Sequence, residues 1–76
     1  MFSVDVLQVG SVGDNVRTLK FLLKQCGLGE FLEENGQFDY VTKDAVLCFQ
    51  RHEDIAPTGI VDDETMSRLI AASDQT

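Results

Sequence analysis

Apolar residues recur at helical spacing in three segments of this chain, and loops rich in Gly, Asp and Asn separate the segments. The spacing predicts helices over residues 14–26, 40–52 and 63–72. None of these helices is long enough to be stable alone, so we expect their apolar stripes to share one core. The stripes are Val16, Leu19, Leu22, Leu23 and Cys26 in the first helix, Val41, Ala45, Val46, Cys48, Phe49 and His52 in the second, and Leu69 and Ala72 in the third.

The residues at the ends of the predicted helices support these boundaries. Asp14, Asp39 and Asp62 stand where a carboxylate can accept hydrogen bonds from the open amides of a first helical turn. Gly27 can end the first helix in the left-handed conformation, which glycine adopts without strain. The sequence therefore predicts an all-α fold, a compact three-helix bundle.

The bundle is expected to be a single domain over residues 1–76, because a chain this short supports one core. Residues 1–7 are interpreted as an N-terminal arm that lies on the body, since Phe2, Val4 and Val6 alternate with polar residues. Residues 73–76 are interpreted as a flexible tail.

A seven-residue phrase occurs three times, and each copy runs into a predicted helix. The copies cover residues 10–16, 36–42 and 59–65, with Gly first, Gly or Asp fourth and a β-branched residue seventh. They begin 26 and 23 residues apart, and repetition at such a period is typical of one supersecondary unit used several times. The phrase thus predicts internal pseudo-repeats and favours a small helical binding module over an enzyme.

The net charge of −7 argues against nucleic acid as a partner, because phosphate binding needs clustered bases and the six Lys and Arg residues are scattered along the sequence. The same charge disfavours anionic membranes and suits a neutral ligand or a basic protein surface. The sequence lacks the long apolar run that a membrane span or a signal peptide requires. As written, the chain is expected to be cytoplasmic, or to reach the cell envelope if it is cut from a secreted protein or delivered by a phage.

Catalysis and metal binding find little support in the residue types. His52 is the lone histidine and belongs to an apolar stripe, so we interpret it as a packed residue rather than a catalyst. The acidic loop at 33–36 resembles a calcium loop, but its register puts Phe31 and Thr42 where carboxylates are needed. No metal or cofactor is therefore expected. Cys26 and Cys48 are interpreted as reduced, buried thiols, although spacing alone does not exclude a disulfide.

Three motifs in order resemble the peptidoglycan-binding domain family, the three-helix module of bacterial cell-wall hydrolases. They are Leu7-x2-Gly10-x2-Gly13-x2-Val16-x2-Leu19, then Gly36-Gln-Phe38-x3-Thr42-x2-Ala45-Val46-x2-Phe49-Gln50, and Thr58-Gly59-x-Val61-Asp62-x2-Thr65-x3-Leu69. The resemblance implies a non-catalytic module that recognises peptidoglycan, through its glycan or its stem peptide, and holds a linked enzyme against the cell wall. The chain departs from the family pattern at Lys20, where Gln is usual, and at Asp39, where Gly is usual.

The resemblance also implies a shallow ligand groove beside the helices and their loops. A sugar or stem peptide needs hydrogen-bonding groups beside an aromatic face. The candidate ligand-binding residues that meet this need are Gln37, Tyr40, Gln50, Arg51 and Thr58. Gln50 has a structural alternative, since its amide can instead bond to backbone.

A second function remains open at this stage, an intracellular protein–protein interaction module such as an adaptor, an inhibitor or a self-associating subunit. Phe21, Leu47 and Ile70 occupy the same position in the three repeats, and each is apolar although it points away from the predicted stripe. They are therefore candidate contacts for a protein partner or for a second copy in a homo-oligomer. The alternative is that the arm or the long loop covers them.

Overall fold

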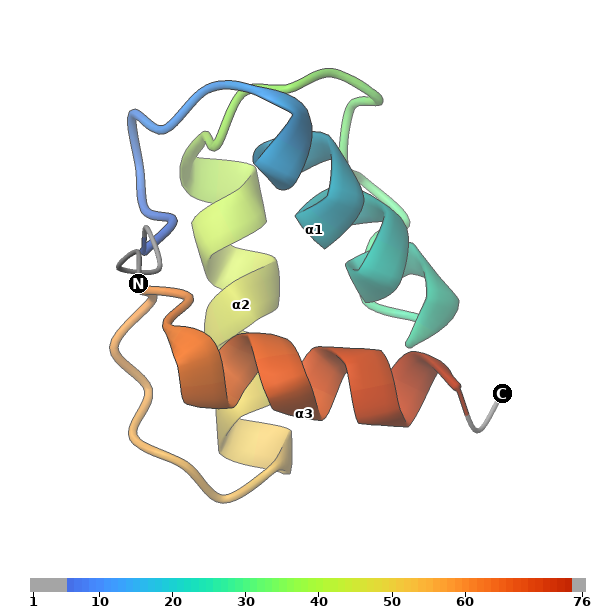
Figure 1. Cartoon of the computed structure of the whole chain (residues 1–76), viewed down its shortest axis with the longest axis vertical. Coiled ribbons are helices and arrows are strands. Elements are labelled where there is room, and N and C mark those ends of the chain that lie inside the picture. Colours follow the sequence, from blue (N-terminus) through green and yellow to red (C-terminus); the bar gives the residue numbers. More distant parts are fainter. Residues whose placement is uncertain (1–5, 75–76) are drawn as a thin grey trace, which may run out of the picture.

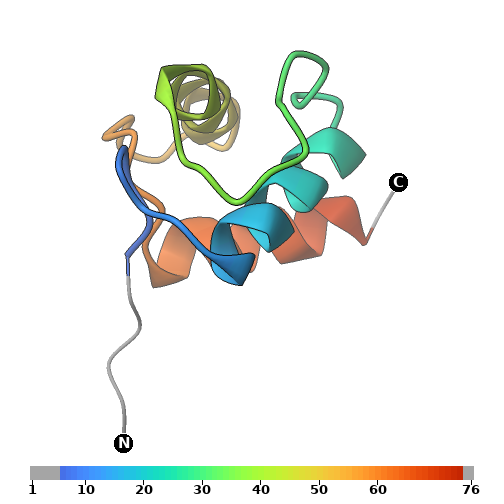
Figure 2. The ribbon, with the colours of Figure 1, turned by 90° about the horizontal axis from the view of Figure 1, so that it is seen from above.

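The computed structural model describes residues 6–74 and shows three helices, α1 (Asp14–Gln25), α2 (Tyr40–His52) and α3 (Asp63–Ser73). α1 packs against both α2 and α3, and α3 crosses the lower part of α2 in Figure 1. Figure 2 looks nearly along α2, with α1 and α3 on one side of it. The described range contains helices and isolated bridges without a strand. The predicted all-α three-helix fold is confirmed.

The core forms where the three apolar stripes meet. It includes the apolar stripe of α1 and side chains from the loops. Phe49 is buried as its stripe predicts, and Phe38 of the central motif is buried with it. Burying side chains of this size is the main favourable term for so small a fold. The buried apolar residues are Leu7, Val16, Leu19, Leu22, Leu23, Leu32, Phe38, Ala45, Val46, Phe49, Val61 and Leu69.

Two of the three predicted aspartate caps are present. The Asp39 carboxylate accepts a hydrogen bond from the Thr42 amide at 3.0 Å, and the Asp62 carboxylate accepts one from the Thr65 amide at 3.0 Å. The prediction for Asp14 is wrong, because this residue already lies in the first turn of α1. Gly13 precedes it with φ 130°, so glycine supplies the turn that starts α1 and no side chain caps it.

The first helix ends as its glycine predicts. Gly27 has φ 84°, its amide bonds to the Lys24 carbonyl, and the Leu28 amide bonds to the Leu23 carbonyl. This pattern is a Schellman motif, which satisfies the last carbonyls of a helix. The third helix extends to Ser73, so the residues predicted as a tail begin inside α3, and 75–76 lie outside the described residues.

Backbone hydrogen bonds join the chain segments that precede the helices. Leu7 and Val61 exchange two backbone hydrogen bonds at 3.0 and 2.8 Å, and the 10–13 and 36–38 segments are joined by three more. Figure 2 shows the segment before α2 dipping toward the start of α1. The loops therefore hold the helix starts together, which the apolar pattern did not predict. Residues 1–5 of the predicted arm lie outside the described residues.

The inward face of α2 is rotated from the predicted stripe. Val41, Cys48 and His52 were assigned to the interior but are exposed, and Cys26 is half-buried. Thr42 and Gln50 take their place in the interior because both have hydrogen-bond partners there. Both cysteines are free thiols. Because Cys48 is exposed, the interpretation of this residue as a buried thiol is wrong. Burial, followed by the nearby Glu53 charge, raises the pKa of Cys26.

The caps give a prediction about acid stability. Hydrogen bonds from the Thr42 amide and hydroxyl lower the pKa of Asp39, so its contribution to stability is present above the unfolded pKa of about 3.9 and is lost as pH falls through the folded value. We expect Asp39→Ala to lower the free energy of unfolding by about 1 kcal/mol at neutral pH. The gap to wild type should narrow below about pH 4. Urea unfolding at neutral and acidic pH measures it.

Asp39→Asn is the matched control for this test, because asparagine is an equally good cap that does not titrate. It should remain close to wild type at neutral pH and lose less stability on acidification. A gap between wild type and Asp39→Ala that is constant with pH would contradict a role for the charged carboxylate.

Candidate functional site

Four of the five ligand-binding residues predicted from sequence lie at the surface. Gln37, Tyr40, Arg51 and Thr58 are exposed, but Gln50 is only 1% exposed. A direct contact joins Gln50 to Thr58, with a long hydrogen bond of 3.4 Å. The prediction for the four exposed residues stays untested, whereas the amide of Gln50 is occupied inside the protein.

Gln50 links α2 to the loop that leads into α3. Its side-chain oxygen accepts a hydrogen bond from the Gly59 amide at 2.9 Å, and its nitrogen donates to the Ile60 carbonyl at 3.0 Å and to the Thr65 hydroxyl at 3.2 Å. Both ends of the amide are therefore satisfied, as a buried carboxamide requires. These bonds give Gln50 the structural role that its backbone-bonding alternative describes.

The predicted partner-contact residues differ in exposure. Phe21 is 58% exposed and Ile70 is 53% exposed, while Leu47 is half-buried. The long loop and residues 6–7 of the arm therefore leave Phe21 and Ile70 accessible. Their role as contacts for a protein partner stays a prediction.

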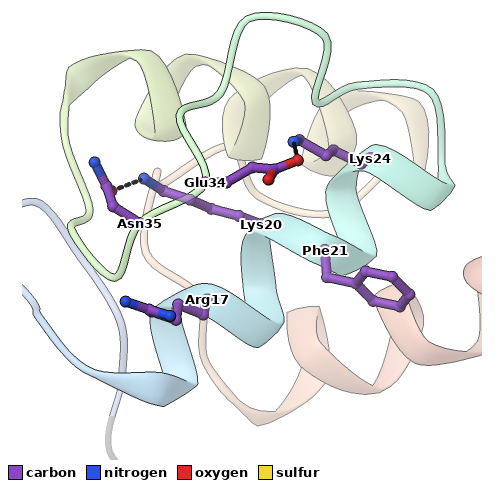
Figure 3. A pocket seen from close by; sticks show the side chains of 6 residues that line it. All are labelled: Arg17, Lys20, Phe21, Lys24, Glu34 and Asn35. Atoms are coloured by element: carbon purple, nitrogen blue, oxygen red, sulfur yellow. Dashed lines mark hydrogen bonds and ion pairs between the residues drawn. The ribbon is translucent and has the colours of Figure 1, made fainter.

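A pocket lies between α1 and the loop at residues 33–36. It has a volume of about 330 Å³ and opens to solvent. Figure 3 shows Lys20 and Lys24 reaching from α1 toward the loop, while Arg17 and Phe21 extend from α1 in opposite directions, with the ring of Phe21 turned away from the loop. The pocket is lined by Arg17, Lys20, Phe21, Lys24, Glu34 and Asn35.

Lys20 forms the floor of this pocket and fixes its loop wall. It is 2% exposed, and its ammonium donates to the Asn35 side-chain oxygen at 2.7 Å and to the Glu33 carbonyl at 3.2 Å. The same Asn35 oxygen accepts a hydrogen bond from the Gln37 amide at 3.0 Å. A charge this buried needs such partners, so the loop is held where it can bind Lys20. The residue that departs from the family pattern thus shapes the pocket.

The other two cations lie nearer to solvent. The Lys24 ammonium pairs with the Glu34 carboxylate at 2.8 Å, and the hydrogen bond and charge of Lys24 lower the pKa of Glu34. Arg17 is exposed, and its guanidinium has no hydrogen bond or ion pair to residues 6–74. The pocket therefore presents a bidentate donor without a partner among residues 6–74, two helical turns from an ammonium that already holds a carboxylate.

The charge distribution corrects a sequence inference. The chain has six basic residues, which look scattered along the sequence, yet three of them line this one pocket. Residues 17, 20 and 24 have spacings of three, four and seven, which place them on one face of a helix. That spacing could have revealed the cationic face of α1. No comparable sequence pattern predicts that the loop at residues 33–36 folds against this face.

A second hollow, of about 240 Å³, lies between α2 and the loop at residues 28–32. Phe31, Val41 and Cys48 line it. Val41 and Cys48, which were expected in the core, therefore lie at this hollow.

Among residues 6–74, no group of three or more His, Cys, Asp or Glu is placed to hold a metal ion. The described helices are also too short and too polar to cross a membrane.

Comparison with known proteins identifies the class of module. A family model described as a peptidoglycan binding domain matches residues 12–69, so the chain belongs to this family. It is a peptidoglycan-binding module built on three helices. A search of curated proteins found no match.

A solved structure supports the same assignment. It is the crystal structure of a fused Zn-dependent amidase/peptidase/peptidoglycan-binding domain-containing protein from Clostridium acetobutylicum ATCC 824. The match has a TM-score of 0.78 and 34% sequence identity, and it covers 86% of this chain. The chain spans 28% of that protein's length, so the likeness concerns one part of the larger protein.

Proposed function

We infer that this chain binds peptidoglycan through the pocket on α1 and leaves bond cleavage to other proteins or domains. The observation that supports this function is the pocket itself, where cationic and amide donors adjoin an exposed aromatic ring. Polar groups that converge beside an apolar surface are typical of ligand sites. The cell wall is the setting in which a module of this family acts.

Sedimentation with purified sacculi tests the function. We expect the chain to be retained at low and at moderate salt, because hydrogen bonds and apolar contacts supplement any attraction between charges. Chitin serves as a control polymer that has a similar glycan without stem peptides. Absence of retention on sacculi at both salt concentrations would contradict the proposal.

The same samples test the absence of catalysis. After incubation with the chain, soluble sugar and peptide fragments released from the sacculi are measured by mass spectrometry. We expect release no greater than that from sacculi alone. Release that depends on the concentration of the chain would show that the module also cleaves the wall.

A further inference from the structure

We propose that the pocket on α1 recognises a carboxylate of the peptidoglycan stem peptide rather than the glycan strand. The proposal rests on the proposed function and names the part of the polymer that the pocket binds. It depends on three observations: the local excess of cations, a carboxylate already paired with one of those cations, and an exposed aromatic ring among the lining residues.

The pocket is positive although the protein is strongly acidic. Three cationic side chains line it, and Glu34 is the one acidic residue among the lining residues. Glu33 lies next to it, bonded to the Asn35 amide at 3.4 Å, and compensates part of the excess. Arg17 is exposed and its guanidinium has no partner among residues 6–74, so together with Lys20 it creates a site for an anion.

Glu34 shows which anion the pocket accommodates. Its side chain is 85% exposed on a loop, and its carboxylate is bound at 2.8 Å by the Lys24 ammonium. An ion pair this exposed contributes little to stability, so a ligand can displace it at small cost. A carboxylate supplied by a ligand can bind Lys24 in place of Glu34, or bind Arg17 two turns earlier in α1. Glu34 then competes with the ligand.

The stem peptide matches this chemistry better than the glycan does. Stem peptides carry free carboxylates and alanine methyl groups, whereas the amino sugars of the glycan are acetylated and uncharged. Arg17 and Lys24 suit a carboxylate, and the exposed ring of Phe21 offers an apolar contact for a neighbouring methyl group. The volume of about 330 Å³ is near the lower end for small-ligand sites, which fits a peptide end.

Two substitutions with opposite expected effects test the proposal. Arg17→Gln removes the open guanidinium, and we expect it to weaken binding of a synthetic stem pentapeptide roughly tenfold, the scale of one hydrogen bond to a charged group. Glu34→Gln removes the competing carboxylate, and we expect binding to become about threefold tighter at low salt. Calorimetric titration measures both affinities. Damage to the fold does not explain a gain in affinity, so the pair separates binding from stability.

The probe and a remote variant supply the controls. The same pentapeptide with all carboxylates converted to carboxamides should bind wild type about tenfold more weakly. Arg68→Gln removes an exposed base of α3 that is outside the pocket, and we expect it to leave the affinity unchanged. If Arg51→Gln weakens binding while Arg17→Gln does not, the sequence-predicted surface on α2 is the site and the proposal is wrong.

The failure of this proposal is distinguishable from failure of the proposed function. If wild type sediments with sacculi but neither Arg17→Gln nor Glu34→Gln changes the affinity, the proposed function stands and the proposed carboxylate site is wrong. Loss of retention after phosphate polymers are stripped from the sacculi would assign the cations to phosphate and also overturn it. Wild type that fails to bind sacculi at all would overturn the function together with this inference.

Discussion

Gln50→Leu is expected to lower the free energy of unfolding by about 2–3 kcal/mol, because it leaves the buried Gly59 amide without an acceptor. The same change removes the donor to the Ile60 carbonyl and the Thr65 hydroxyl. A domain of this size rarely has more than about 5 kcal/mol of stability. The melting temperature should therefore fall by roughly 10–20 °C, as measured by circular dichroism.

Gln25→Leu is the matched control, since Gln25 is exposed at the end of α1. It makes the same chemical change without removing a partner of a buried group, and we expect an effect within about 0.5 kcal/mol. Equal stabilities of the two variants would contradict the structural role of Gln50. If Gln50→Leu keeps the stability of wild type but binds sacculi more weakly, Gln50 is a ligand-binding residue after all.

Local signals in the sequence predicted the positions of the helices well. The bounds of α2 are those predicted, and Asp39, Asp62 and Gly27 act as expected because capping depends on residues adjacent in sequence. The inward face of α2 was harder to predict. Val41 and Cys48 extend its apolar stripe, but polar Thr42 and Gln50 are buried because partners elsewhere in the fold satisfy them. A hydropathy pattern does not contain those partners.

The pocket illustrates the same limit. The spacing of Arg17, Lys20 and Lys24 could have shown that they share one face of a helix. The burial of Lys20 depends on Asn35 and the Glu33 carbonyl, which reach it only when the loop folds back onto α1. Net charge was misleading for a related reason, because it averages over the surface and hides a local excess of the opposite sign.

Gly36 provides the second large effect that we expect. A Cβ at this position would lie 2.7 Å from the Gly13 carbonyl oxygen, closer than such contacts occur in proteins. That oxygen accepts hydrogen bonds from the Val16 and Arg17 amides and so begins α1. Since backbone must move to admit the methyl group, we expect Gly36→Ala to lower the free energy of unfolding by about 2–3 kcal/mol. Urea unfolding followed by circular dichroism measures the loss.

A local readout separates this steric effect from the general cost of replacing glycine. Amide hydrogen exchange at Val16 and Arg17 should accelerate in Gly36→Ala, because the helix start is displaced together with its acceptor. Gly27→Ala is the comparison: its φ of 84° is strained for alanine, but no atom lies within 4 Å of the added Cβ. It should lower stability without a specific change at the start of α1. If amide exchange at Val16 and Arg17 is unchanged in Gly36→Ala, the loop that contains residue 36 moves to admit the methyl group and the start of α1 does not. The contact between the first two repeats would then not position the arginine that flanks the pocket.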